Sequence, residues 1–481
     1  MNSDDISINT THFGKSTKTV QYAATISVCF AALSAGTVLA WSSPAISELG
    51  IPKSLNSTTE DDIMKNITRN GIRLTKKEEA LLGSVLNLGA LIYAIPTGYI
   101  ADKWGRKMAI YLSAFSFLLG WFLIVIAKNV TTLLIARFFS GMGLGAICVV
   151  APMYVGEIAE NSLRATLSSY FQIFLSLGIF VTFVVGAITD YVTMSLILAI
   201  FPIILLITFP LMPESHVHLV KVRKINEAEK SLIRFRGNKR GYDINGEMEI
   251  IRQEVKKSSN NSGSITDIVS NKPNRNAMVA VLGMLIFQQM CGINAITFYT
   301  EQIFAEADAG VDPSLGAIIM GALQFVGGYL GMVLIEKAGR KFFLILSSIG
   351  MMLGLCVLSV FFHFQHLKYN VSSFEFIPVI CAALFILSFT MAYGSIPYMM
   401  MHELLSPEIR AIGSGIAIVA CWVTSFLITY AFPLALVSIG NYMTFYILTA
   451  VNALAIIFVI FFVPETRGRT LIEIQEVLAN Q

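Results

Sequence analysis

Long stretches without a charged residue alternate with short charged segments along most of the chain. Ten of these stretches are each long enough for one crossing of a bilayer: 19–47, 80–101, 108–127, 138–156, 165–189, 191–213, 276–300, 313–335, 342–367 and 376–402. A helix of ~20 apolar residues spans the ~30 Å hydrocarbon core, so the last stretch, 411–464, is too long for one crossing. We expect a break in it between Pro433 and Asn441, where turn-forming residues occur. The pattern predicts an all-α integral membrane protein with twelve transmembrane helices.

The composition agrees with this class and excludes a soluble protein. Hydrophobic residues make up 55% of the 481 positions and charged residues only 14%, whereas soluble domains average ~25% charged residues. The mean hydropathy is +0.68. The net charge of +3 creates no basic field that would attract nucleic acid. The polar start and the long first apolar stretch differ from a secretory signal peptide, so we expect no cleaved leader.

Lys and Arg are concentrated in alternate loops, and this pattern sets the expected orientation. The N-terminus and the charged segment 214–275 fall on the richer side, so the positive-inside rule places both termini in the cytoplasm. The 48–79 loop then lies outside, where its sequons predict glycosylation of Asn56 and Asn66. All six cysteines lie inside predicted spans, where they act as small apolar residues, so we expect no disulfide.

The two halves of the chain repeat three short motifs in the same order. The paired motifs are Gly105-Arg106-Lys107 with Gly339-Arg340-Lys341, Glu157 to Arg164 with Glu403 to Arg410, and Pro213-Glu-Ser with Pro464-Glu-Thr. Parallel six-helix repeats that rock about a midplane site are typical of alternating-access transporters. We therefore expect a six-helix half over 1–213, a charged helical linker over 214–275, a second half over 276–465 and a short tail over 466–481.

Charged residues of the repeated loops are candidates for ion pairs that depend on conformation. They are Asp102, Arg106, Glu157 and Arg164 in the first half, and Glu336, Arg340, Glu403 and Arg410 in the second. Partial shielding from water strengthens an ion pair, and a pair present in only one state biases the equilibrium between states. We expect these pairs to hold an outward-facing form and to separate on inward opening. Ordinary solvated charges beside the spans are the alternative.

Three amides, Gln288, Gln289 and Asn294, share one predicted span. An amide without partners is costly in hydrocarbon, so each needs a ligand or another helix. In a straight helix Asn294 would lie about 240° around from Gln288, so both could not face one ligand. Gly292 indicates a break between them, as at the binding sites of other transporters. Amides suit a neutral, hydroxyl-rich ligand, and interhelical hydrogen bonding is the alternative.

Other patterns favour structural readings. No uncharged stretch holds the nucleophile, paired acids or metal ligands of a membrane enzyme, so we predict no catalytic residue, no metal and no cofactor. The glycines between Gly141 and Gly145 lie inside a span, where they favour close helix packing over a nucleotide loop. Segments within 214–275 and 471–478 predict amphipathic helices that either latch the halves together or only link them.

Four motifs together resemble the sugar porter family of the major facilitator superfamily. They are Gly98…Asp102…Gly105-Arg106-Lys107, Pro152-Met-Tyr154-Val-Gly-Glu157…Arg164, Gln288-Gln289-Met-Cys-Gly292-Ile-Asn294, and Pro464-Glu-Thr-Arg-Gly-Arg-Thr470. The resemblance covers nearly the whole chain and implies the major facilitator fold. The Trp41-Ser-Ser-Pro44 segment, the short tail and the His402-Glu403 pair are most similar to insect facilitated trehalose or glucose transporters.

The resemblance implies a site for a small neutral sugar. The substrate-binding residues of the family correspond to Gln172, Gln288, Gln289, Asn294, Gln324, Gly394, Tyr398 and Trp422. Its gate residues carry over to Phe298, Tyr299 and Pro397. Tyr398 stands where the family has a stacking tryptophan, and Cys421 stands where glucose carriers have asparagine. The site is therefore expected to be kept but reshaped.

These observations predict a plasma-membrane uniporter that acts as a monomer in the lipid bilayer. Family members that couple to protons carry an aspartate at the position that corresponds to Thr37, and a threonine cannot exchange a proton at physiological pH. A proton-coupled symporter is the main alternative, and a sugar sensor of the same fold is another. Glucose, trehalose, another hexose or a polyol remain open as the substrate.

Overall fold

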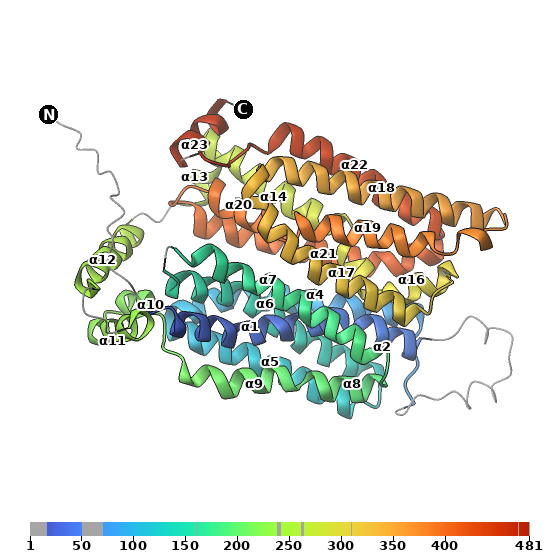
Figure 1. Cartoon of the computed structure of the whole chain (residues 1–481), viewed down its shortest axis with the longest axis horizontal. Helices are drawn as coiled ribbons and strands as arrows, with labels where there is room; N and C mark the ends of the chain where they lie inside the picture. The colour runs from blue at the N-terminus through green and yellow to red at the C-terminus, as the bar shows by residue number, and fades with distance from the viewer. Residues whose placement is uncertain are drawn as a thin grey trace.

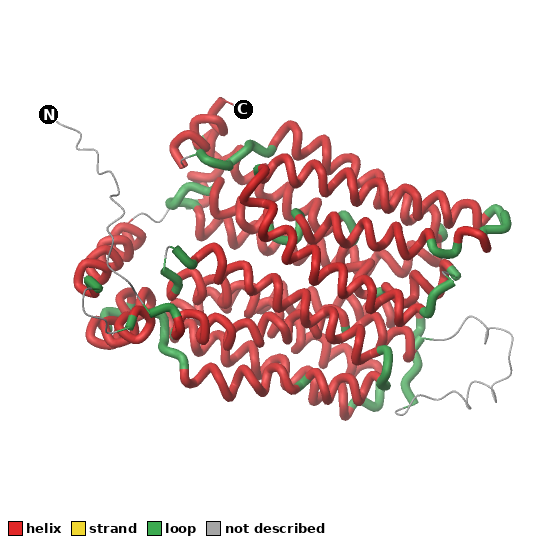
Figure 2. Tube along the Cα trace, in the orientation of Figure 1, coloured by secondary structure: helices red, strands yellow, loops and turns green. Residues whose placement is uncertain are grey.

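The protein is a bundle of α-helices arranged in two halves (Figure 1). The computed structural model describes residues 17–50, 71–160, 162–237, 242–260, 264–308, 310–469 and 471–480. The predicted glycosylation sites Asn56 and Asn66 lie outside these ranges. Within them, Figure 2 shows helices joined by loops and no strand. Among the described residues, twelve helical segments are long and apolar enough to cross a membrane, which confirms the predicted fold class.

Six crossings make up the first half. They are formed by α1 (Thr19–Ala40) with α2 (Ser42–Leu49), α4 (Lys76–Trp104), α5 (Arg106–Ile126), α6 (Val130–Ile158), α7 (Arg164–Gly186), and α8 (Tyr191–Leu198) with α9 (Ile200–Thr208) and the 3-10 turn η2 (Phe209–Leu211). Local caps fix where helices begin. Thr75 forms a capping box with Glu78 before α4, and Asn129 accepts the N–H of Thr132 before α6.

The described residues of the charged linker form four helices. They are α10 (His216–Lys221), α11 (Ile225–Arg236), α12 (Ile244–Asn260) and α13 (Ile265–Ser270). Buried side chains such as Leu219, Leu232 and Met248 give α10 to α12 a small core of their own. This unit docks on the first half, because Arg236 Nη1 donates to the carbonyl oxygen of Ile158 at 2.9 Å.

The second half repeats the arrangement. Its helices are α14 (Lys272–Met290), α15 (Ile293–Phe298), α16 (Thr300–Ala307), α17 (Pro313–Ala338), α18 (Arg340–His366), the 3-10 turn η3 (Ser372–Phe374), α19 (Ile377–Met391), α20 (Ile396–Leu404), α21 (Arg410–Ser438), α22 (Asn441–Phe462) and α23 (Leu471–Asn480). The break expected between Pro433 and Asn441 falls at Gly440, whose φ is +84°. Pro433 itself stays inside α21.

Glycines allow neighbouring helices of the first half to touch along their backbones. A Cβ on Gly141 or Gly145 of α6 would collide with the carbonyl oxygens of Leu86 and Ala90 on α4. The glycine-rich segment of the fourth crossing therefore serves close packing, as predicted.

The main contacts between the halves pair α4 with α21 and α7 with α17, and smaller contacts pair α1 and α2 with α15 and α2 with α16. We call the end of the bundle with α2 and α16 the loop end, and the end with α10 to α13 and α23 the linker end (Figure 1). At the α7–α17 contact, a Cβ on Gly321 would lie 2.9 Å from Cα of Phe180.

Hydrogen bonds between the halves are found toward the loop end. Gln302 Nε2 donates to Glu79 Oε2 at 3.2 Å, and Asn87 Nδ2 donates to Thr429 Oγ1 at 2.9 Å. The halves are therefore closed against each other on this side.

At the linker end the peripheral helices divide between the halves. The α10–α12 unit contacts the first half through α1 and α6. By contrast, α23 docks on the second half, where Gln475 Nε2 donates to the carbonyl oxygen of Leu404 at 2.8 Å.

Candidate functional site

Two crossings of the second half are interrupted within the bundle. Between α14 and α15, Gly292 adopts the left-handed conformation with φ +92°, as the spacing of the amides predicts. Between α19 and α20, the chain leaves the helix from Ala392 to Ser395. Interrupted backbone at membrane depth must find other hydrogen-bond partners. Gln288 Nε2 supplies one by donating to the carbonyl oxygen of Tyr393.

The three predicted amides form one hydrogen-bonded cluster around the first break. Asn294 Nδ2 donates to Gln289 Oε1 at 2.8 Å and to Ser425 Oγ of α21 at 2.7 Å. Gln289 Nε2 lies 3.3 Å from Gln288 Oε1 and 3.2 Å from Cys421 Sγ. The cluster therefore consists of neutral donors and acceptors, which match the hydroxyl groups of an uncharged ligand.

Tyr398 of α20 extends this cluster toward the other half. Its hydroxyl lies 3.7 Å from the sulfur of Cys421, and Cys148 of α6 lies within electrostatic range of both groups. The side chain is nevertheless 37% exposed. Tyr398 and Gln289 thus meet at the same sulfur, which places an aromatic side chain beside the amides.

The remaining predicted substrate residues surround the cluster unevenly. A Cβ on Gly394 would lie 3.7 Å from Nε2 of Gln172, so α7 of the first half reaches the break between α19 and α20. Gln324 is buried in α17, and Trp422 is partly buried in α21. Among the described residues, neither of these two makes a hydrogen bond to the amide cluster.

The predicted gate residues Phe298 and Tyr299 are fully buried where the halves meet. The hydroxyl of Tyr299 lies 3.2 Å from the carbonyl oxygen of Glu79 on α4, and its ring stacks on Phe432 at 5.9 Å. Tyr299 thus links both halves on the loop-end side of the amides. Pro397 lies apart from this contact, buried in the first turn of α20.

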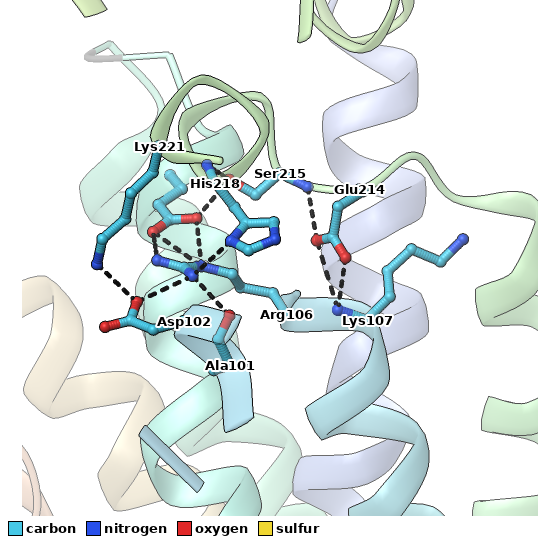
Figure 3. Close-up of polar contacts among 9 residues, drawn as sticks. Ala101, Asp102, Arg106, Lys107, Glu214, Ser215, His218 and Lys221 are labelled. Atoms are coloured by element: carbon cyan, nitrogen blue, oxygen red, sulfur yellow. Dashed lines mark hydrogen bonds and ion pairs between the residues drawn. The ribbon is translucent and has the colours of Figure 1, made fainter. Parts of the chain in front are cut away.

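Predicted ion pairs of the first half meet at the linker end (Figure 3). The Arg106 guanidinium is 4% exposed and lies 2.6 Å from Glu157 and 3.1 Å from Asp102. It also donates to the carbonyl oxygen of Ala101 and contacts Nδ1 of His218 on α10 at 3.0 Å. The guanidinium therefore ties α5 and α6 to the linker helices.

The second half repeats this arrangement in part. Arg340 lies 3.2 Å from Glu403, whereas Arg410 donates to the carbonyl oxygen of Leu405. The side chain of Glu336 lies outside the part of the chain that the structure describes. Arg164 is exposed. Among the predicted network residues whose side chains are described, no ion pair joins the two halves, and Asp102 also pairs with Lys221 of the linker helix α10 at 2.9 Å.

Two carboxylates that the sequence reading did not assign complete the repeated motifs. Glu214 accepts the backbone N–H of Lys107 at the start of α5, at 3.1 Å. Glu465 accepts the N–H groups of Arg340 and Lys341 at the start of α18, at 3.1 and 3.0 Å. Each Pro-Glu motif therefore caps the helix that begins at the Gly-Arg-Lys motif of its own half, where the helix dipole favours an anion.

The two caps differ in electrostatics. Burial alone would raise the pKa of Glu465, but hydrogen bonds from the N–H groups of Arg467, Arg340 and Lys341 lower it overall. For Glu214 burial prevails and raises the pKa. The Gly-Arg-Lys and Pro-Glu motifs occur in the same order in both halves, and this repetition is the signal that indicates they belong together.

Arg137 of α6 was also missed, because it lies just before an uncharged stretch. Its guanidinium is fully buried, donates to the carbonyl oxygen of Val38 at 2.7 Å and to Ser42 Oγ at 2.6 Å, and lies over the ring of Trp41. A buried cation needs such partners. Arg137 therefore fixes the junction of α1 and α2 near the loop end.

Two halves joined around broken helices and a neutral polar cluster define a transporter of the major facilitator type. A family model described as sugar (and other) transporter matches residues 21–478, and the chain belongs to this family. Its fold is similar to the inward open conformation of the xylose transporter XylE from E. coli, with a TM-score of 0.74 and 21% identity, over 95% of this chain and 99% of that chain.

Sequence relatives point to the same family. The chain is 32% identical to the facilitated trehalose transporter Tret1 of Apis mellifera ligustica, over 96% of this chain and 89% of the relative. It is 35% identical to the sugar transporter ERD6-like 7 of Arabidopsis thaliana, over 85% and 88%. The protein is thus a multi-pass membrane transporter of a family that is not an enzyme class.

Proposed function

We propose that this protein is a uniporter that moves a neutral sugar across the plasma membrane by alternating access, with the linker end in the cytoplasm. The observation that carries the proposal is the amide cluster around Gly292, which offers only uncharged hydrogen-bonding groups. Relatives named as trehalose transporters support a glucose unit, free or in trehalose, as the substrate.

The environment of Thr37 supports passive transport. Its side chain is fully buried, and its hydroxyl donates to the carbonyl oxygen of Ser34 at 2.7 Å. Proton coupling at this position needs a group that changes charge during the cycle, such as a carboxylate or an imidazole. A hydroxyl that is satisfied by its own helix provides no such group, so the sugar gradient alone drives the cycle.

The closed loop end corresponds to the inward-facing stage of this cycle. Tyr299 acts as the outer gate, and its release from Glu79 accompanies outward opening. Arg164 and Arg410 make no ion pair with a described residue here, so they are the members of the proposed network that are free to pair when the linker end closes. Arg106 and Glu157 are paired in this form, so in this proposal they stay paired through the cycle, in place of the separation expected from the sequence.

Uptake into proteoliposomes tests the proposal. We expect saturable uptake of radiolabelled glucose or trehalose that equilibrates without accumulation, accelerates when unlabelled sugar is inside, and ignores a protonophore. Xylose and sucrose serve as comparison sugars. Steady accumulation of a sugar that collapses with the protonophore would move the protein to the proton symporters, and absence of uptake for every sugar would favour a sensor.

A further inference from the structure

Glu301, in the first turn of α16, lies where the loop end is closed. Its backbone N–H donates to Ser43 Oγ of α2 at 3.1 Å, across the boundary between the halves. The residue is 3% exposed. The next residue, Gln302, makes the hydrogen bond to Glu79 described above. Any opening of this end separates α16 from α2 and exposes the Glu301 side chain to water.

Among the described residues, no cation faces the Glu301 carboxyl group, and its Oε1 atom is buried without a hydrogen-bond partner. Near α16, the titratable groups on the elements packed against it are Glu48 of α2, Tyr299 between α15 and α16, Asp312 before α17 and Cys381 of α19. All of these are acids or neutral groups.

Basic residues of the first half at the loop end have other partners, including Arg137, which is held by Val38 and Ser42. Lys76 lies 2.9 Å from Glu79, and Arg73 donates to the carbonyl oxygens of Glu48 and Gly50 at 3.2 Å. An ionised Glu301 would therefore be buried without a counter-charge, which is strongly unfavourable.

A polar cavity of about 320 Å³ lies beside Glu301. Its lining comes from both halves and includes Ser47, Glu48, Asp190 and Ser314 together with Glu301. A cavity of this size and polarity holds water, which gives a proton a route to the carboxyl group. The two other carboxylates on its wall make the site attractive to a proton.

We propose that Glu301 is a proton-binding site of the outer gate, which closes on the carboxylic acid rather than on the carboxylate. The proton comes from the outer solution when the gate closes and returns there when it opens, so the cycle moves no net charge. The site regulates the gate and does not energise transport, which makes it compatible with uniport.

The acid–base properties of the closed gate agree with this geometry. Burial raises the pKa of Glu301 from 4.5 to about 7, the hydrogen bond from Ser47 opposes this, and Asp312 adds to it. In the open gate, water returns the pKa toward its ordinary value. The closed form then binds more protons, so the closing equilibrium rises about tenfold per pH unit as pH falls from about 7 toward 4.5. Above about pH 7 the carboxyl group is ionised in both forms, so protonation no longer favours the closed gate.

Distance measurements across the gate test the proposal. Nitroxide labels carried by p-acetylphenylalanine replace Lys77 of α4 and Ala305 of α16, which are exposed on opposite halves at the loop end. Double electron–electron resonance measures the distance between the two labels in nanodiscs without sugar, at about pH 8 and about pH 5.5. We expect the ratio of short to long distances to rise about tenfold or more at the lower pH.

Two variants separate Glu301 from other acidic groups. Glu301→Gln mimics the neutral side chain, so the short distance should dominate at both pH values. Asp308→Asn removes an exposed carboxylate from the end of the same helix and should keep the full pH response. Glu301→Met, which is uncharged and of similar length, repeats the test if the glutamine variant does not fold.

The proposal is overturned if the unaltered protein shows no pH response, if both neutral variants retain it, or if Asp308→Asn abolishes it. No sugar is present in these measurements. A failure of sugar uptake would therefore contradict the proposed uniport while leaving the result for the gate unaffected.

Discussion

Gln289 and Asn294 lie on opposite sides of the helix break at Gly292, yet their side chains share a hydrogen bond of 2.8 Å. In an unbroken helix a separation of five residues would turn them about 140° apart. The break thus gathers amides that a regular helix would disperse, and Ser425 on α21 holds the outer one in place.

Replacing Asn294 or Gln289 by alanine should reduce saturable sugar uptake about two- to tenfold or more and leave surface expression near that of the unaltered protein. Each change removes a neutral hydrogen bond worth ~0.5–1.5 kcal/mol, and more where the partner amide is stranded. Uptake and surface biotinylation measure the two effects. Gln253→Ala, on the exposed surface of α12, is the matched control. Normal uptake in both site variants would contradict the assignment.

Gly292→Ala should lower the unfolding temperature of the purified protein. Its φ of +92° is unfavourable for a residue with a Cβ, at a cost of ~1–2 kcal/mol, and the added atom would lie 3.0 Å from Leu448 Cδ1. In the control Gly415→Ala, on α21, the new Cβ meets nothing within 4 Å, and helix stability rises by ~0.5–1 kcal/mol. Equal melting of both variants would argue against strain at the break.

Arg106→Ala should destabilise the linker end far more than Lys224→Ala. Removal of the Arg106 guanidinium leaves Glu157 without its cation, and breaking a buried pair costs ~3–5 kcal/mol. Lys224 and Glu227 form an exposed pair at 3.4 Å that contributes little. Thermal unfolding of both variants in the same detergent compares them. A similar loss in both would show that burial does not set the strength of the Arg106 pair.

The linker end should become less stable as pH falls from about 6.5 toward 4. Burial, together with the charge of Arg106, lowers the pKa of His218 from 6.5 to about 4. The unfolded chain therefore takes up a proton in this range that the folded imidazole does not bind, and stability is lost as pH falls. Unfolding temperatures across this range should decline less for His218→Gln than for the unaltered protein. His366→Gln, on an exposed histidine of α18, should decline normally.

Deglycosylation tests the orientation. Removal of N-glycans should increase the gel mobility of the protein expressed in insect cells, and the shift should vanish in an Asn56→Gln, Asn66→Gln double variant. Both sequons fall in the segment between α2 and α4, on the side proposed to be extracellular. A glycan at Asn260 instead would place the linker outside and invert the topology.

Hydrophobicity and short motifs were sufficient to predict the twelve crossings, their order and the family. These features are local, because a span is defined by about 20 consecutive apolar residues and a motif by a few positions. The break at Gly292 was predictable for the same reason: the spacing of three amides along one helix is readable without knowledge of any neighbour.

Only the tertiary structure decided which groups meet. The sequence did not show that Gln288 satisfies the backbone of Tyr393, that Glu214 caps the helix starting beside Lys107, or that Arg137 is held by carbonyl oxygens. Nor did it show that Glu301 is buried between the halves. These contacts join residues far apart in the chain, and their free energies depend on how helices pack and on which end of the bundle is closed. A linear pattern of polar and apolar residues contains neither the packing of the helices nor the end at which the bundle is closed.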